Sequence, residues 1–65
     1  MNATTNTTYK TRNYTDYNVT ITANDNATVT KVYTTKHGKF YDVATTHNGN
    51  LNVHESILNS VLVLN

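Results

Sequence analysis

The sequence contains no cysteine, no proline and no tryptophan, and only two of its 65 residues are glycine. Without cysteine the chain has neither disulfides nor thiolate metal sites, which are the usual supports of very small domains. A chain of this length forms one small domain, over residues 1–65, and buries only about 60% of the surface that it exposes when unfolded. Unusually good packing or oligomerisation must compensate for this small core, and we expect a homo-oligomer.

Charged residues are also scarce, at 14% of the chain, and the formal net charge is only +1. Domains that bind nucleic acids through a basic surface usually have a pI above about 9, whereas this chain has a pI of about 8.1. The small net charge argues against disorder, although Ile, Leu, Val and Phe together occupy only 14 positions. We therefore predict a folded domain in which residues 1–8 form a flexible lead-in or an edge strand.

The sequence opens without a basic stretch followed by an apolar run. No run of apolar residues approaches the length of about 18 that would span a membrane. Either pattern would have indicated secretion or membrane insertion. We therefore expect a cytoplasmic protein with no membrane partner.

Threonine and asparagine are what the sequence has in abundance, with 14 and 11 residues respectively. Threonine is β-branched and suits a half-exposed strand, whereas asparagine favours turns and left-handed backbone positions. The composition and the patterns below favour an α+β fold, a small antiparallel meander of four or five short strands with one C-terminal helix packed on one face. An all-β fold with a C-terminal strand is the alternative.

Hydrophobic alternation locates the strands. Residues 17–23 alternate most cleanly, with Tyr17, Val19 and Ile21 on one face, and they predict a half-buried strand. A second strand is expected over residues 27–35, where the register changes midway and favours either a bulge or two covered faces. The other strands are expected over residues 9–14, as an edge at best, 40–46 and 51–53.

Turn residues separate these strands. Residues 24–26 are Asn, Asp and Asn, which tolerate turn conformations, and Gly38 can adopt a positive φ within the turn over residues 36–39. Asn48 and Gly49 form the strongest hairpin signal, because a two-residue type I′ loop requires a positive φ at both central positions. We therefore predict a tight hairpin at these two residues.

The C-terminal part of the chain is the most apolar, and eight of the 14 strongly apolar residues lie between residues 51 and 64. Their spacing predicts a helix over residues 53–62, with Asn52 as its N-cap and Glu55 in the third position of a capping box. A strand over residues 60–64, buried on both faces, is the rival prediction. We expect the oligomer interface to contain Ile57, Leu58, Val61, Leu62, Val63 and Leu64.

No constellation for catalysis or metal binding emerges from the sequence. The metal-like set is the three histidines with two acids, but His37 and His47 flank the strand expected over residues 40–46 and would lie about 25 to 30 Å apart. A nucleophile would be Ser56, Ser60 or a threonine, and the available bases are scattered over the expected turns without the mutual reach that a catalytic triad requires. We expect no enzymatic activity, no metal and no cofactor.

Aromatic and basic residues interleave along the chain. Single-stranded nucleic acids bind by stacking their bases on aromatic side chains while Lys and Arg contact the phosphates. One hypothesis is therefore a single-stranded nucleic-acid-binding β domain, with contacts from Tyr9, Lys10, Arg12, Tyr14, Lys31, Tyr33, Lys36, Lys39, Phe40 and Tyr41.

The uneven distribution of apolar residues favours a different function. A surplus at one end of a chain that is otherwise poor in them is typical of a surface that contacts another protein. We therefore expect a small, non-enzymatic protein-interaction module of the inhibitor, adaptor or accessory type. Its expected partners are a second copy of itself and another protein, and single-stranded nucleic acid is the alternative partner.

Overall fold

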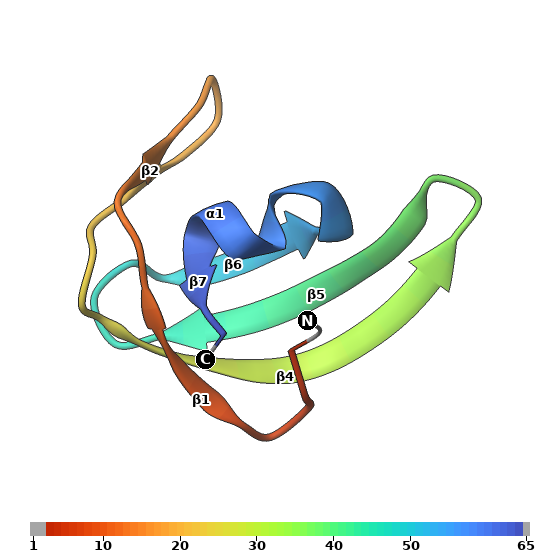
Figure 1. The fold of residues 1–65 in the computed structure, drawn as a ribbon, viewed down its shortest axis with the longest axis horizontal. Helices are drawn as coiled ribbons and strands as arrows, with labels where there is room; N and C mark the ends of the chain where they lie inside the picture. The colour runs from red at the N-terminus through yellow and green to blue at the C-terminus, as the bar shows by residue number, and fades with distance from the viewer. Residues whose placement is uncertain (1–2, 65) are drawn as a thin grey trace.

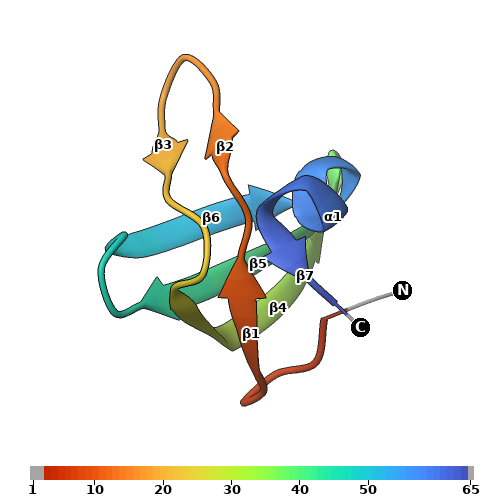
Figure 2. The ribbon, with the colours of Figure 1, turned by 60° about the vertical axis from the view of Figure 1, so that its left-hand side comes forward.

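The computed structural model describes residues 3–64. Its elements are β1 (Thr8–Thr11), β2 (Tyr14–Thr15), β3 (Thr20–Ile21), β4 (Asn26–Thr35), β5 (Gly38–Thr45), β6 (Asn50–His54), the 3₁₀ turn η1 (Glu55–Ile57), α1 (Leu58–Val61) and β7 (Leu62–Val63). Five antiparallel strands form one bent sheet in the order β6-β5-β4-β1-β7 (Figure 1). Figure 2 shows the separate β2–β3 hairpin projecting from this sheet. The architecture confirms the expected α+β meander with one C-terminal helix.

Strands β4, β5 and β6 form the regular meander of the sheet. The register between β4 and β5 shifts between Val29 and Lys31, so the bulge is the correct one of the two alternatives for this strand. The bulge keeps both Val29 and Val32 directed toward the core on either side of it. Gly38 has a φ of 114° at the start of β5, as the turn requires. The strands predicted over residues 27–35 and 40–46 are correct to within two residues.

The hairpin between β5 and β6 differs from the predicted two-residue loop. The last strand pair joins Ala44 to Asn50, and the Thr45 N–H donates to the Gly49 carbonyl, so the loop is longer than two residues. Gly49 has a positive φ of 74°, but Asn48 is not among the residues with a positive φ. Asn48 binds the turn between β3 and β4 instead, and this tertiary contact replaces the type I′ geometry.

The β3–β4 turn is held by Asp25, which is only 6% exposed. Its Oδ2 accepts hydrogen bonds from the N–H groups of His47 and Asn48 and from Asn48 Nδ2, at 2.8, 3.1 and 2.8 Å. Burial raises the pKa of Asp25, but these hydrogen bonds and the nearby His47 lower the pKa by more, so the pKa is lowered overall. The side chain of Asn48 also bonds both backbone groups of Thr22. These contacts fasten the base of the β2–β3 hairpin to the β5–β6 loop.

The strand predicted over residues 17–23 is wrong. Within this range only the two residues of β3 form a strand, and Tyr17 is fully exposed at the tip of the β2–β3 hairpin. The Asp16 carboxylate accepts hydrogen bonds from the N–H groups of Asn18 and Val19, so the backbone turns where the alternation predicts an extended chain.

Strand β1 is central in the sheet, although the sequence predicts an edge strand here. It lies between β4 and β7, with Thr11 opposite Leu62. Thr11 is buried, and its hydroxyl donates to the Thr22 carbonyl at 2.6 Å and accepts from the Asp25 N–H at 3.0 Å. Because the hydroxyl is fully hydrogen-bonded, a threonine takes the buried position for which the prediction required an aliphatic residue.

The C-terminal part of the chain combines the two rival predictions. The helix predicted over residues 53–62 is shortened to η1 and one turn of α1, because β6 continues past Val53 and β7 begins at Leu62. The rival strand is therefore present as β7. The N-cap is His54, whose side chain accepts a hydrogen bond from the N–H two residues later, and the predicted cap Asn52 lies within β6.

The buried apolar side chains come from β3 to β7, from α1 and from both ends of the described chain. They are Ala3, Ile21, Ala27, Val29, Tyr41, Val43, Leu51, Val53, Leu58, Val61, Leu62 and Leu64. Near the start of the chain, the Asn6 N–H donates to the Val29 carbonyl at 2.7 Å. The flexible lead-in expected over residues 1–8 lies partly outside the described residues and stays a prediction.

Candidate functional site

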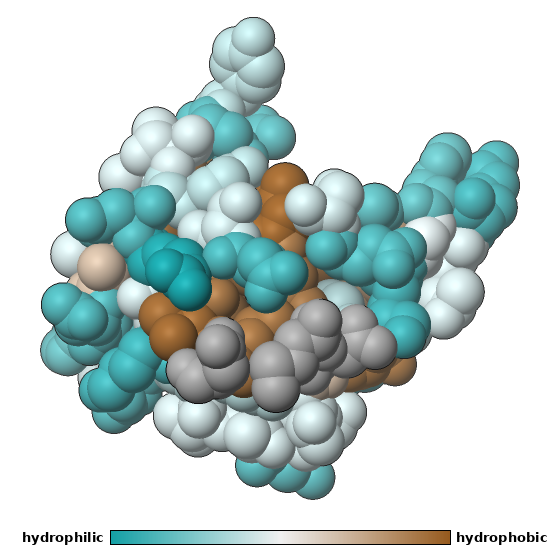
Figure 3. Space-filling model, viewed as in Figure 1, coloured by the Kyte–Doolittle hydropathy of each residue, from teal (hydrophilic) through white to brown (hydrophobic). Residues whose placement is uncertain are grey.

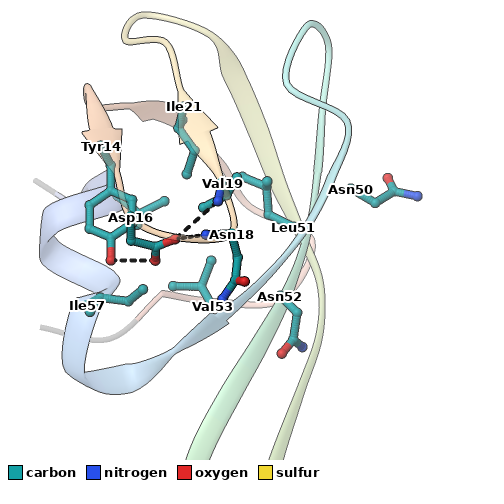
Figure 4. A pocket seen from close by; sticks show the side chains of 11 residues that line it. Tyr14, Asp16, Asn18, Val19, Ile21, Asn50, Leu51, Asn52, Val53 and Ile57 are labelled. Atoms are coloured by element: carbon teal, nitrogen blue, oxygen red, sulfur yellow. Dashed lines mark hydrogen bonds between the residues drawn. The ribbon is translucent and has the colours of Figure 1, made fainter.

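A hollow of about 290 Å³ separates the β2–β3 hairpin from β6 (Figure 4). Its floor is apolar and consists of Leu51 and Val53 from β6, Ile21 from β3, and Ile57 and Val61 from the C-terminal part of the chain. The space-filling view shows polar side chains over the two projections of the molecule and apolar surface between them (Figure 3). The hollow has room for one or two apolar side chains.

β6 borders this hollow with an unpaired edge. Within residues 3–64, β6 has a single neighbouring strand, β5. The Thr45 N–H donates to the Gly49 carbonyl. In an antiparallel ladder, hydrogen-bonded and non-hydrogen-bonded residue pairs alternate, so this bond determines which residues of β6 bond to β5. Leu51 and Val53 therefore exchange backbone hydrogen bonds with β5. Asn50 and Asn52 direct their N–H and C=O groups away from β5, toward the free edge.

Asp16 is the charged residue among those that line the hollow. Its Oδ1 accepts from the N–H groups of Asn18 and Val19 at 2.8 and 3.1 Å, and its Oδ2 accepts from the Tyr14 hydroxyl at 3.0 Å. The hydrogen bond from Asn18, followed by that from Tyr14, lowers the pKa of Asp16 against the opposing effect of burial. The same hydrogen bond to Asp16 raises the pKa of Tyr14. A charged carboxylate thus fixes the shape of the hairpin that forms one wall.

A second hollow, of about 360 Å³, lies beside the same strand. Asp42 and Asn52 pair across β5 and β6 and alternate along their strands with the buried Val43 and Val53. Their side chains therefore lie on the outer face of the sheet, opposite the core. The residues that line this outer hollow are Thr30, Asp42, Val43, Asn50, Leu51 and Asn52. The edge of β6 is thus flanked by a hollow on each side of the sheet.

Asn52 has a fixed side-chain orientation on this outer face. Its Nδ2 donates to the Tyr33 hydroxyl and to Asp42 Oδ1, both at 2.8 Å. Since a carboxylate only accepts hydrogen bonds, the amide nitrogen must face Asp42, and both of its protons are used. The outer side of the edge therefore presents acceptors, namely Asn52 Oδ1 and the Asp42 carboxylate.

The structure brings together three of the residues predicted to contact nucleic acid. The rings of Tyr33 and Phe40 stack with centroids 5.8 Å apart, and Lys31 Nζ lies 5.4 Å from the Tyr33 centroid. Phe40 also contacts the His54 ring edge to face, with centroids 4.9 Å apart. Tyr33 and Phe40 therefore each have two neighbours around the ring, and both side chains are half-buried. A stacked base needs an uncovered ring face.

The other residues of the predicted nucleic-acid surface are dispersed. Tyr41 is 1% exposed and belongs to the core, so its predicted role in stacking is wrong. Tyr14 lines the hollow, where its hydroxyl bonds Asp16. The remaining ones are on β1 and just after it (Tyr9, Lys10 and Arg12) and at the β4–β5 turn (Lys36 and Lys39).

The predicted oligomer interface is mostly interior. Leu58, Val61, Leu62 and Leu64 are buried within the chain itself, so they are not on the surface as the predicted interface requires. Their burial follows from the small size of the domain, which needs these side chains for its core. Ile57 is half-buried in the hollow and Val63 is half-buried in β7. The expected homo-oligomer itself stays a prediction.

Asn50, Asn52 and Asp16 are absent from the residues predicted from the sequence to form a site. The alternation of asparagine with apolar residues over residues 50–53 indicates a strand with one polar face. Which edge of that strand is free depends on the strand order, and no local pattern contains this information.

Between residues 3 and 64, no three His, Cys, Asp or Glu side chains are grouped so as to hold a metal ion. In the same range, no helix is long and apolar enough to cross a membrane. Comparison with known proteins finds no matching family model, no matching curated protein and no matching solved structure.

Proposed function

We propose that this protein is a small, non-enzymatic protein-interaction module that binds an extended segment of a partner protein along the free edge of β6. The observation that carries the proposal is the outward direction of the N–H and C=O groups of Asn50 and Asn52, beside an apolar hollow. Unpaired backbone groups on a sheet edge pair with a second extended chain, and hollows beside the edge receive its side chains.

The shape of the site favours a polypeptide ligand. The hollow beside β6 has a volume of about 290 Å³. Its apolar floor continues along the strand from Leu51 to Val53, and the β2–β3 hairpin forms the opposite wall. An extended segment in this groove gains backbone hydrogen bonds from the edge and buries its own apolar side chains against the floor, whose residues are themselves largely buried already.

The nucleic-acid hypothesis has less support. The rings of Tyr33 and Phe40 pack beside each other, with Lys31 and His54 as further neighbours, and Tyr41 is in the core. A second copy of the chain is one protein that presents a free strand, so the homo-oligomer expected from the sequence remains part of the proposal, as does the cytoplasmic location. Sedimentation equilibrium distinguishes a second copy from another partner.

The matched variants Asn52→Pro and Asn52→Ala test the proposal. Both remove the side-chain amide, but only proline removes the outward N–H. The β5–β6 ladder does not use this N–H, so both variants keep the ladder. The probe is a set of binders selected against the full chain from a displayed library of random peptides of about ten residues.

We expect the selected peptides to bind Asn52→Pro at least about tenfold more weakly than Asn52→Ala, because one backbone hydrogen bond is lost and a carbonyl of the peptide is left unpaired. Circular dichroism checks that both variants are folded. Equal affinity of the two variants, or a library that yields no binder to the wild-type chain, would overturn the proposal.

A further inference from the structure

We infer that the segment bound by β6 has an apolar–basic–apolar pattern, with Lys or Arg opposite Asn52 and an apolar residue on each side of it. The inference rests on the proposed function and adds to it the sequence of the partner segment. It follows from the two hollows that flank the edge and from the hydrogen-bonding groups on the outer face.

The alternation of a strand sets which residues of the segment face each hollow. Successive side chains of an extended chain point to opposite faces of the sheet. The residue directly opposite Asn52 therefore shares its outer face, where the hollow of about 360 Å³ lies. The residues before and after it point inward, into the hollow of about 290 Å³ between β6 and the hairpin.

The inner positions require apolar side chains. Leu51, Val53, Ile21 and Val61 form the floor of the inner hollow, and Ile57, which is half-buried, borders it. Figure 4 shows Leu51, Val53 and Ile57 around this space, while Asn50 points away from it. The polar groups of the opposite wall are bonded to one another, because the Asp16 carboxylate accepts from the Tyr14 hydroxyl and from two N–H groups of the hairpin. A polar side chain placed against the apolar floor would therefore lose hydrogen bonds to water without gaining a partner there.

The outer position requires a donor. Both protons of Asn52 Nδ2 are used by Tyr33 and Asp42, so the amide presents only its oxygen to an added strand. Asp42 is about 10 Å from the added strand, two strand spacings away, and only a long side chain extends that far. Lysine and arginine satisfy both conditions, whereas a carboxylate would face acceptors of its own kind.

Charge favours the same pattern. Asp16 lines the inner hollow and Asp42 lines the outer one, and no Lys or Arg is among the described residues that line either hollow. Lys31, the cross-strand neighbour of Asp42, places its Nζ over the Tyr33 ring. A cationic segment therefore approaches the edge favourably, and an anionic one is repelled.

Three synthetic peptides with identical flanks test the pattern on the isotope-labelled full chain. Their central residues are Val-Lys-Val, Val-Glu-Val and Lys-Val-Val, and the last has the composition of the first but the wrong alternation. Dissociation constants come from NMR titrations that follow the amides of Asn50 and Asn52. We expect Val-Lys-Val to bind at least about tenfold more tightly than either of the others.

The variant Asp42→Asn distinguishes the contribution of the Asp42 charge from that of the order of apolar and charged residues in the peptide. It should reduce the preference for Val-Lys-Val over Val-Glu-Val to within about threefold, whereas a smaller preference over Lys-Val-Val should persist, because the apolar contacts of the inner hollow do not involve Asp42. If all three peptides bind equally and Asn52→Pro abolishes their binding, the pattern is wrong while the proposed function stands. If the Asn50 and Asn52 amides respond to none of the peptides, the pattern is wrong as well, and the library selection decides the proposed function separately.

Discussion

The C-terminal part of the chain, residues 57–64, and strand β6 border the same hollow but have opposite roles. The C-terminal part is strongly apolar and mostly interior, and Leu58, Val61 and Leu62 are at most 3% exposed. β6 alternates asparagine with apolar residues, and its outer edge has no neighbouring strand within residues 3–64. In a domain of this size, the most apolar segment forms the core, and the surface proposed for binding consists of the backbone groups of a strand edge and the hollows beside it.

The reason for this division is energetic. A domain of about 65 residues buries a smaller fraction of its surface than a larger domain does, and its core alone supplies only about 3 to 5 kcal/mol of net stability. Leaving Leu62 or Val61 on the surface for a partner would remove much of that stability. A strand edge, by contrast, can remain unpaired at little cost while its backbone groups are hydrated.

The largest effect is expected for Leu62→Ala, which tests the structural role of the C-terminal part. Leu62 is fully buried, and the substitution should cost about 2 to 5 kcal/mol, which is comparable with the whole stability of such a domain. Urea unfolding followed by circular dichroism measures the loss, with Asn52→Ala on β6 as the mild control. A Leu62→Ala chain of unchanged stability but altered oligomeric state would show that this residue forms an interface instead.

Low pH should reduce the stability that the hydrogen bonds of Asp16 and Asp25 give to the β2–β3 hairpin and its base. The pKa values of Asp16 and Asp25 are lowered in the folded chain, so the unfolded chain takes up protons more readily. Their contribution to stability is present above the unfolded pKa of about 4 and is lost as the pH falls through the folded values below it. Urea unfolding between about pH 2 and 7 measures this dependence. In the Asp25→Asn variant the free energy of unfolding should depend less on pH. An unchanged pH dependence in that variant would contradict this role of Asp25.

The smallest effect is expected at the hairpin tip. Tyr17 is fully exposed while Ile21 is 3% exposed. Tyr17→Ala should change the free energy of unfolding by less than about 0.5 kcal/mol, whereas Ile21→Val should cost about 0.5 to 1.5 kcal/mol. Thermal unfolding of both variants checks which substitution causes the larger loss of stability. A larger loss for Tyr17→Ala than for Ile21→Val would return Tyr17 to the apolar face that the alternation predicts.

The parts of the fold that the sequence predicts correctly are governed by local rules. The extents of β4 and β5 follow from alternation and from the turn residues around Gly38. The opposite parity of Val29 and Val32 predicts either a bulge or two covered faces, and the register shift shows that the bulge is present. Each of these features depends on residues within a few positions of one another.

The parts that the sequence does not predict depend on distant contacts. The helix is shorter than predicted because β6 pairs with β5 up to His54, which delays its start, and because Leu62 pairs with Thr11, which ends it. The hairpin tip is set by the hydrogen bonds of Asp16, which override the alternation of its neighbours. The candidate site depends on the strand order, which leaves β6 without an outer neighbour between residues 3 and 64.

Amide hydrogen exchange along β6 tests the central claim most directly, because it reports each backbone N–H separately. In the free chain, the amides of Leu51 and Val53 should exchange slowly and those of Asn50 and Asn52 rapidly. Addition of the Val-Lys-Val peptide should slow exchange at Asn52. Equal protection of all four amides in the free chain, or unchanged exchange at Asn52 with saturating peptide, would contradict the claim that β6 is a free edge that binds an extended segment.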